Sequence, residues 1–359
     1  MFNDSCIHAL SQLGFTIHLA ANFDEDGSGG QNTRYVEACI ENGYVVHSLG
    51  FQRASIKKNV KHIQKFKEWL ATQSFDLIHA HTETGGTILR LAGGSLRKTK
   101  KVFTPHGMSF WRGCSLKRQM VYQPIERWIA SAMDVNVAIN EEEYTYFKKW
   151  NNRTARLIRG AGLDFRRFDR PILSRNEIRR ELGIPESSML VIAVGELNEN
   201  KNHITLIRAV ADMKDPNVWL IICGTGSLRS YLQDESNKFV IPSHLILAGY
   251  QSNISDMLYA SDLFVSLSYH EGLPVSLLEA MRVGLPVIVS RVRGHVDLIQ
   301  DGVGGYLCSP NDISRVSTLI KQLIREPRLR QQFGSINRSR TEIYEIGKVV
   351  DELKDIYCL

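Results

Sequence analysis

The chain has 359 residues and a mass of 40.7 kDa, which is long for a single core and suits two domains of roughly 150–180 residues each. Hydrophobic residues make up 43% and charged residues 23%, as in an ordinary globular protein, so a disordered, collagen-like or coiled-coil chain is excluded. No run of about 18 apolar residues is present, and the first residues lack the charged-then-apolar pattern of a secretory signal.

The net charge of +6 is unevenly distributed. Residues 1–170 carry 24 Lys and Arg against 16 Asp and Glu, whereas the remainder carries 20 against 22. A basic first half predicts an anionic ligand or surface, which we interpret as the cytoplasmic face of a membrane, because no nucleic-acid-binding motif is present. Six scattered cysteines with no CxxC pair suit reduced thiols in a cytosol and predict no metal site.

Short β-branched runs separated by helical patterns occur in two series. The first series is Thr16–Ala20, Val45–Leu49, Leu77–Ala80, Val102–Thr104 and Val135–Ile139. After a break near residues 160–185, the second series is Leu190–Val194, Trp219–Cys223, Leu245–Leu247, Leu263–Ser266 and Val287–Val289. This alternation predicts an α/β protein with two doubly wound parallel-sheet domains that face a ligand-binding cleft.

The predicted domain boundaries follow from the break between the two series of strands. Residues 1–165 form a basic domain that faces the membrane, and residues 166–340 form a second domain that binds the ligand. Residues 341–359 form a helix that packs back toward the first domain.

Two segments of the first half combine apolar and basic residues. Ile56–Leu70 has apolar residues at helical spacing with lysines between them, which is typical of a surface helix or of a helix lying on a membrane. Phe110–Tyr122 mixes aromatic residues with cations in the same way. The acidic run Asp24–Asp26 imitates a DxD metal motif, but the glycines that follow favour a surface loop.

Candidate ligand-binding residues are most concentrated in residues 269–281, directly after the predicted strand Leu263–Ser266. Pro274 and Gly284 bracket a short helix, so this loop lies where a parallel strand ends and a helix begins. Backbone N–H groups at such a helix entry suit phosphate oxygens. Glu271 in the loop can accept hydrogen bonds from ligand hydroxyls, and Glu279 can reach a diol; both need partners in a segment destined for burial.

The spacing Glu271-x7-Glu279 within Glu-Gly-Leu-Pro and Glu-Ala-Met resembles the retaining GT-B glycosyltransferases of family 4, and the capsule and exopolysaccharide branch in particular. The likeness covers most of the chain, including residues 194–202, Gly224–Gly226, Pro105–Gly107 and the segment 76–82. It implies a hexosyltransferase that uses a nucleotide-sugar donor, with UDP as the expected nucleotide, and a lipid-linked, polyprenyl diphosphate acceptor. It also implies a cytoplasmic protein associated peripherally with the inner face of the membrane, working in capsule, exopolysaccharide or O-antigen (lipopolysaccharide) synthesis, without a cofactor or metal.

The resemblance also implies roles for individual residues. Glu271 holds hydroxyls of the donor sugar, Lys201 neutralises the diphosphate, and His106 faces the sugar near the reacting carbon. Glu279 holds the ribose. The rest of the nucleotide-sugar site is Gly272, Leu273, Pro274, Val275, Gly195, Glu196, Gly224 and Tyr250.

Two departures from the family pattern leave alternatives open. Glu196 stands where the family often has an arginine, which removes one phosphate cation unless Arg291 or Arg293 compensates. The first strand of the N-terminal domain and its glycine-rich loop are missing, because the first helix begins near Cys6; either the start is assigned too late or the product is impaired. The alternatives are therefore a truncated or degenerate non-catalytic subunit and a UDP-sugar 2-epimerase of the same fold.

Overall fold

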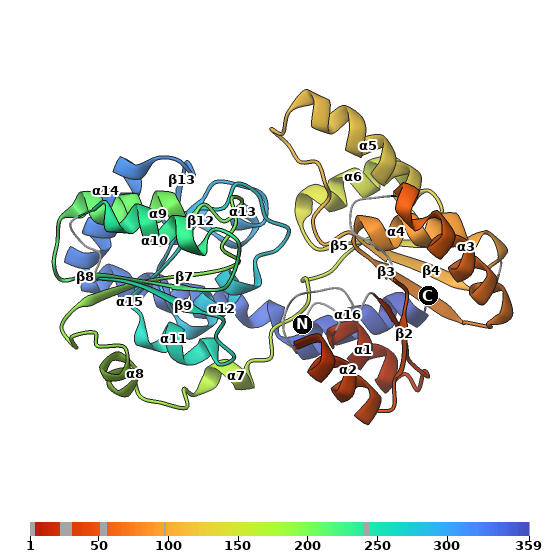
Figure 1. The fold of residues 1–359 in the computed structure, drawn as a ribbon, viewed down its shortest axis with the longest axis horizontal. Helices are drawn as coiled ribbons and strands as arrows, with labels where there is room; N and C mark the ends of the chain where they lie inside the picture. Colours follow the sequence, from red (N-terminus) through yellow and green to blue (C-terminus); the bar gives the residue numbers. More distant parts are fainter. Residues whose placement is uncertain (1–3, 22–30, 51–55, 97, 240–243, 359) are drawn as a thin grey trace. The chain divides into compact units, whose positions relative to one another are not determined.

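The computed structural model describes residues 4–21, 31–50, 56–96, 98–239 and 244–358. The chain divides into two units (Figure 1): unit 1 is Met1–Ala161 together with Gly347–Leu359, and unit 2 is Gly162–Ile346. Leu163 donates its N–H to Tyr344 O, and Ile346 donates to Leu163 O, at 2.8 and 3.0 Å. These bonds explain why residues 162–165 and 341–346 belong to unit 2 rather than to the flanking segments that the sequence predicted.

Unit 1 contains parallel strands in two separate sheets. Its strands are β1 (His18–Ala21), β2 (Val45–Ser48), β3 (Leu77–His81), β4 (Lys100–Thr104), β5 (Val135–Ala138) and β6 (Ala155–Leu157). Its helices are α1 (Asp4–Gln12), α2 (Gln31–Glu41), α3 (Ile56–Thr72), α4 (Thr82–Ala92), η1 (Gly93–Ser95), α5 (Leu116–Ala130), α6 (Glu141–Asn151) and α16 (Ile346–Cys358).

The sheet of unit 1 is interrupted between β1 and β3. Among the described residues β1 pairs with β2, and β3 begins a separate four-stranded sheet in the order β3-β4-β5-β6. Side chains span the interruption instead, as where His18 of β1 contacts Phe75 edge-on, with ring centroids 5.2 Å apart.

Unit 2 has one parallel sheet of seven strands. The strands are β7 (Met189–Val194), β8 (Val218–Cys223), β9 (Leu245–Gly249), β10 (Leu263–Ser266), β11 (Val287–Ser290), β12 (Gln300–Asp301) and β13 (Gly304–Cys308). The helices are α7 (Arg166–Asp169), α8 (Arg175–Glu181), α9 (His203–Met213), α10 (Arg229–Asn237), α11 (Ile254–Ala260), α12 (Val275–Val283), α13 (His295–Leu298), α14 (Ile313–Arg325), α15 (Pro327–Arg340) and η3 (Thr341–Tyr344).

The strand order of unit 2 is β12-β13-β11-β10-β7-β8-β9. The first strand along the chain, β7, thus lies between β8 and β10, and the chain winds outward from it in both directions. Helices α9, α10 and α14 cover one face of the sheet, and α11, α12 and α15 cover the other (Figure 1). Since both faces are covered, the strands are apolar along their whole length, as Leu190, Val191, Ile192 and Ala193 of β7 show by being buried.

The two amphipathic segments of unit 1 differ in exposure. On α3 the side chains of Trp69 and Leu70 pack inward: Leu70 is buried, and Trp69 contacts His47 with ring centroids 4.6 Å apart. On α5 large apolar side chains face outward, and Leu116 and Met120 are 77% and 76% exposed. Within the part of the chain that the structure describes, no helix combines the length and apolar character needed to cross a bilayer.

Candidate functional site

The loops after β7 and β10 meet at the point where the winding of unit 2 reverses. They leave neighbouring parallel strands at the same edge of the sheet and lead to helices on opposite faces. Ligands of doubly wound sheets bind at such a point. Tyr269 donates its N–H to Asn200 O at 2.9 Å, and Asn200 Nδ2 donates to His270 O at 3.0 Å. The two segments that the sequence singled out are therefore locked together by main-chain and amide hydrogen bonds.

An ion pair joins the two loops at their centre. Lys201 Nζ lies 2.7 Å from Glu271 Oε1, and the side chains of Lys201 and Glu271 are only 21% and 11% exposed. Burial is the largest effect on the pKa of Glu271 and acts to raise it, but the charges of Lys201 and His295 and the hydrogen bonds from Lys201 and Ser268 together outweigh it. The pKa is therefore lowered, and the group stays a carboxylate. The ammonium has three donors, so two remain for an anionic ligand beside Glu271.

Helix α12 enters the site through Pro274. Pro274 occupies its N-cap position and Gly284, with φ of 89°, its C-cap position. Since proline has no N–H, Pro274 fixes the direction of the helix rather than donating to a ligand; the candidate donors on this segment are Gly272, Leu273 and Val275. The macrodipole adds positive potential at this end of the helix.

Gly294, the N-cap residue of α13, lies close to the segment that leads into α12. Gly294 has φ of 80°, and a Cβ there would lie 2.6 Å from Gly272 O and 3.1 Å from Pro274 Cδ. Only glycine allows the two loops to approach this closely.

The loops after β7 and β8 also pack against each other. Leu197 donates its N–H to Thr225 O at 2.9 Å, and a Cβ on Gly224 would lie 1.9 Å from Gly195 O. Gly195 in turn lies against the Lys201 side chain, where a Cβ would be 3.1 Å from Lys201 Cε. Gly195 and Gly224 thus belong to the immediate surroundings of Lys201.

Glu196 and Tyr250 complete the predicted set in unit 2. Glu196 Oε2 accepts a hydrogen bond from Asn198 Nδ2 at 2.9 Å, within its own loop. Tyr250 follows β9 and is 61% exposed. Both follow strands at the same edge of the sheet as Lys201.

Glu279 is the buried carboxyl of α12, with 5% of its surface exposed. Burial raises its pKa to about 7, although Arg167 acts in the opposite direction. A carboxyl held near its titration point inside an apolar helix entry is a strong acceptor for hydroxyl donors once it ionises.

Two further residues lie near the Lys201–Glu271 ion pair. His295 was not predicted from the sequence, and Arg293 was named only as a cation that could compensate for Glu196. His295 is fully buried in α13; its Nδ1 lies 3.0 Å from Ser290 O, and its interaction with Glu271 opposes the effect of burial, which lowers its pKa to about 4. Arg293 Nε donates to Glu271 O at 2.9 Å, which places this cation beside the loop that carries Glu271, whereas Arg291 pairs with Asp301 at 2.7 Å. Nothing local in the sequence marks His295 as a neighbour of Glu271.

His106 lies in unit 1, immediately after β4. Its backbone has φ of 57°, a left-handed conformation that is uncommon for a non-glycine residue. His106 Nε2 lies 2.8 Å from His81 Nδ1, and burial lowers the pKa of His106 to about 4, so the ring is neutral. A neutral imidazole donates through one nitrogen and accepts through the other.

Buried carboxylates hold the loop that follows His106. Glu143 Oε1 accepts from the Met108 N–H at 2.8 Å, and Glu126 Oε1 accepts from the Ser109 N–H at 3.3 Å. Both glutamates are fully buried. This support was not predicted, because Glu126 of α5 and Glu143 of α6 reach the loop only in the folded chain. The acidic run Asp24–Asp26 lies outside the described residues.

Two family models cover nearly the whole chain. Residues 4–159 match Glycosyltransferase Family 4, and residues 174–340 match Glycosyl transferases group 1.

Similar proteins agree with these matches. A protein of Bacillus subtilis (strain 168), named "Putative glycosyltransferase EpsD", is 30% identical over 96% of this chain and 90% of its own length. An Escherichia coli protein named UDP-Gal:alpha-D-GlcNAc-diphosphoundecaprenol alpha-1,3-galactosyltransferase is 25% identical over 84% of this chain and 80% of its own.

Solved structures share the fold. Anabaena Alr3699/HepE, crystallised with UDP and glucose, superimposes with a TM-score of 0.78 at 16% identity, covering 95% of this chain and 99% of that one. Sucrose-phosphate synthase from Thermosynechococcus elongatus gives 0.75 at 20% identity, covering 95% and 98%. Together with the sheet order and the loops that meet beside β7, these matches show that the chain is a glycosyltransferase with the GT-B fold, and that it belongs to the group 1 and family 4 glycosyltransferases.

Proposed function

We propose that this enzyme transfers a hexosyl group from a UDP-sugar, with retention of configuration, to a lipid-linked sugar in the synthesis of a surface polysaccharide such as capsule, exopolysaccharide or O-antigen. The observation that carries the proposal is the Lys201–Glu271 pair beside the entry of α12. This pair offers a cation for a diphosphate and a carboxylate for sugar hydroxyls within one hydrogen-bonded unit.

The proposed chemistry follows from the charges that develop. As the bond between the anomeric carbon and the phosphate oxygen breaks, negative charge grows on the departing UDP, and Lys201 with the N-terminus of α12 stabilises it. The acceptor hydroxyl attacks from the same face, and its proton passes to the leaving phosphate. The products are UDP and the new glycoside, and the protein supplies the needed positive charge without a metal.

Further roles complete the proposed site. Glu279 binds the ribose hydroxyls, and Tyr250 with the loops at Gly195, Glu196 and Gly224 surrounds the nucleotide. His106, whose ring is neutral, hydrogen-bonds a donor-sugar hydroxyl near the reacting carbon.

The proposal of a membrane-bound acceptor is supported by a surface of unit 1 that combines basic and apolar side chains. The groove along α5 has a volume of about 630 Å³ and is lined by Leu116, Gln119, Met120, Gln123, Pro124, Arg127, Trp128 and Ser131. Exposed Lys117 and Arg127 on the same helix suit anionic headgroups, while the apolar side chains suit acyl or polyprenyl chains. The diphosphoundecaprenol in the name of the E. coli relative points to the same class of acceptor. We therefore propose that the enzyme binds peripherally to the inner face of the membrane.

The test begins with the donor. Thermal unfolding with UDP, GDP and ADP identifies the nucleotide, because a ligand that binds only the native state raises the unfolding temperature. UDP-sugars are then incubated with synthetic sugar-diphosphate-polyprenol acceptors, and the anomeric configuration of the product is read by NMR.

The possible outcomes separate the alternatives. A UDP-selective shift and an α-linked product from an α-linked donor are expected. Conversion of UDP-N-acetylglucosamine without any acceptor would identify the epimerase instead. A cooperative unfolding transition that no nucleotide shifts would identify a non-catalytic subunit.

A further inference from the structure

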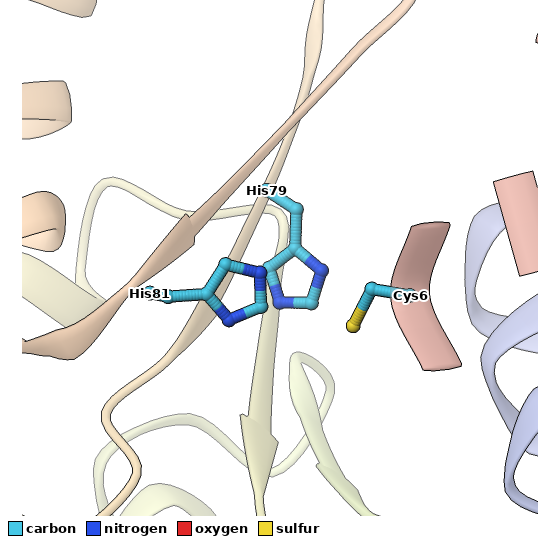
Figure 2. A group of neighbouring side chains, drawn as sticks. All are labelled: Cys6, His79 and His81. Carbon is cyan, nitrogen blue, oxygen red and sulfur yellow. The ribbon is translucent and has the colours of Figure 1, made fainter. Parts of the chain in front are cut away.

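Three potential metal ligands from distant parts of the sequence lie together in unit 1. One ligand atom from each of Cys6, His79 and His81 lies within 4.8 Å of the other two. Figure 2 shows the two imidazoles side by side, with the Cys6 side chain of α1 pointing toward them. We propose that Cys6, His79 and His81 form a binding site for a divalent transition-metal ion of the zinc class.

Local structure explains why these side chains converge. His79 and His81 alternate with Ala80 along β3, so both imidazoles lie on the same face of the strand, with ring centroids 4.1 Å apart. Cys6 is buried on the inward side of α1 together with Ser5 and Ala9. A thiolate and two neutral imidazoles are the ligands that Zn²⁺ prefers, at about 2.3 Å for sulfur and about 2.0 Å for nitrogen.

Each imidazole already has a partner that fixes one of its nitrogens. His81 Nδ1 lies 2.8 Å from His106 Nε2, which leaves His81 Nε2 for the ion. His79 Nε2 lies 2.8 Å from Thr104 Oγ1, and His79 Nδ1 lies 2.8 Å from Tyr357 Oη. A second partner on the nitrogen away from the metal is the usual arrangement for histidine ligands, since it fixes the tautomer and the ring orientation.

The hydroxyl of Tyr357 marks the side on which the ion would bind. It hydrogen-bonds both to His79 Nδ1 and to Cys6, so it lies between the thiol and the imidazole. On binding, the ion replaces these hydrogen bonds: His79 Nδ1 and His81 Nε2 supply lone pairs, and Cys6 supplies a thiolate and releases its proton to solvent. The Tyr357 oxygen or a water fills the fourth position of a tetrahedral site.

The site has no residue in common with the proposed diphosphate site, although its ligand His81 is hydrogen-bonded to His106, which is proposed to contact the donor sugar. Its ligands belong to unit 1, and the proposed transfer chemistry of Lys201 and Glu271 in unit 2 needs no metal. The spacing rule that predicted no metal site considers only cysteines close in sequence, whereas these ligands are joined by the fold.

The test measures zinc stoichiometry and affinity on the full chain. Metal-free protein is titrated with Zn²⁺ against a chromophoric chelator, and bound zinc is counted by mass spectrometry after desalting. We expect one equivalent of zinc, lost in Cys6→Ala and in His79→Gln. Cys39→Ala, which removes another buried thiol of unit 1, should retain it. Thr104→Val should weaken zinc binding by about 10–100-fold, because it removes only the support for His79.

Co²⁺ provides a readout that needs no variant. Bound to the unaltered chain, it should give a thiolate-to-cobalt charge-transfer band and the intense visible bands of a tetrahedral site. Zinc bound equally by Cys6→Ala would overturn the proposal, as would the absence of zinc binding. A cobalt spectrum without the thiolate band would also overturn it, even if Cys6→Ala fails to fold.

Discussion

Lys201 neutralises Glu271 in the structure and is proposed to neutralise a diphosphate during the reaction. Replacing it therefore has two separable effects. Removing the ammonium leaves the Glu271 carboxylate largely buried without its counter-charge, and it also removes one stabilising group from the leaving diphosphate.

We expect Lys201→Ala to lower the transfer rate by about 10²–10³-fold and to lower the unfolding temperature. Adding Glu271→Gln should restore the unfolding temperature but not the activity, because the uncompensated charge is gone while the cation is still missing. Calorimetry and a UDP-release assay on the two single variants and the double variant measure both effects. A double variant that regains the parent rate would refute the role of Lys201 in the reaction.

Glu279 should make stability depend on pH. Its pKa is about 7 in the native state against 4.5 in an unfolded chain, so the native state binds the proton more tightly. The resulting stabilisation is complete below about pH 4.5 and is lost as pH rises through 7, an effect of roughly 3 kcal/mol in the free energy of unfolding. Urea unfolding at pH 5 and pH 8 measures it, and Glu279→Gln is the control. An equal pH dependence in the Glu279→Gln protein would assign the effect to other groups.

At the scale of elements, the site depends on a close contact between the loop at Gly294 and the backbone of the loop at Gly272. In Gly294→Ala the new Cβ would meet Gly272 O at 2.6 Å and displace the loop that carries Glu271. Gly183→Ala has a similar positive φ of 69° but nothing within 4 Å of its Cβ, so it reports the conformational strain alone.

We expect the positive φ to cost each alanine variant about 1 kcal/mol of stability, and the contact with Gly272 O to destabilise Gly294→Ala further. Only Gly294→Ala should also weaken UDP binding, by about tenfold or more, as measured by calorimetric titration. If the two variants bind UDP equally well, the contact between Gly294 and Gly272 does not shape the site.

Local patterns predicted the strands well but not all of them. Each predicted strand is present within a few residues of its expected ends, because buried parallel strands are continuous apolar runs. β6 was missed because it has three residues, and β13 because it begins with two glycines. The bounds of α12 were predicted from Pro274 and Gly284, whose backbone preferences act locally.

The family resemblance, and not a local pattern, placed Lys201 and Glu271 in one site. In the structure the strand order of the doubly wound sheet brings residues 195–201 beside residues 269–275, where Lys201 and Glu271 form an ion pair. The contacts of Glu143 with Met108 and of His295 with Glu271 were not predicted, because they depend on how helices pack on the finished sheets.

At the scale of the whole molecule, the excess positive charge and the exposed face of α5 determine the expected membrane behaviour. Met120→Glu places a carboxylate on that face, whereas Ile172→Glu makes the same change at an apolar side chain of unit 2 that is 80% exposed. We expect Met120→Glu to weaken binding to phosphatidylglycerol vesicles by about 10–100-fold, since burying one such side chain is worth about 1.5–3 kcal/mol. Ile172→Glu should bind as the parent does in vesicle flotation. Equal losses would mean that net charge alone governs the association.

The interrupted sheet of unit 1 has a consequence for cooperativity. Backbone hydrogen bonds connect β3 through β6 into one ladder, whereas among the described residues β1 and β2 bond only to each other and join the rest through side chains such as His18, Phe75 and Trp69. A two-strand ribbon that is held in this way can open without breaking the neighbouring ladder. Amide hydrogens of Leu19 and Val46 should therefore exchange with solvent through a local opening, long before those of Val102 and Val137. Exchange of all four at one common rate would show instead that side-chain packing alone couples the two sheets into a single folding unit.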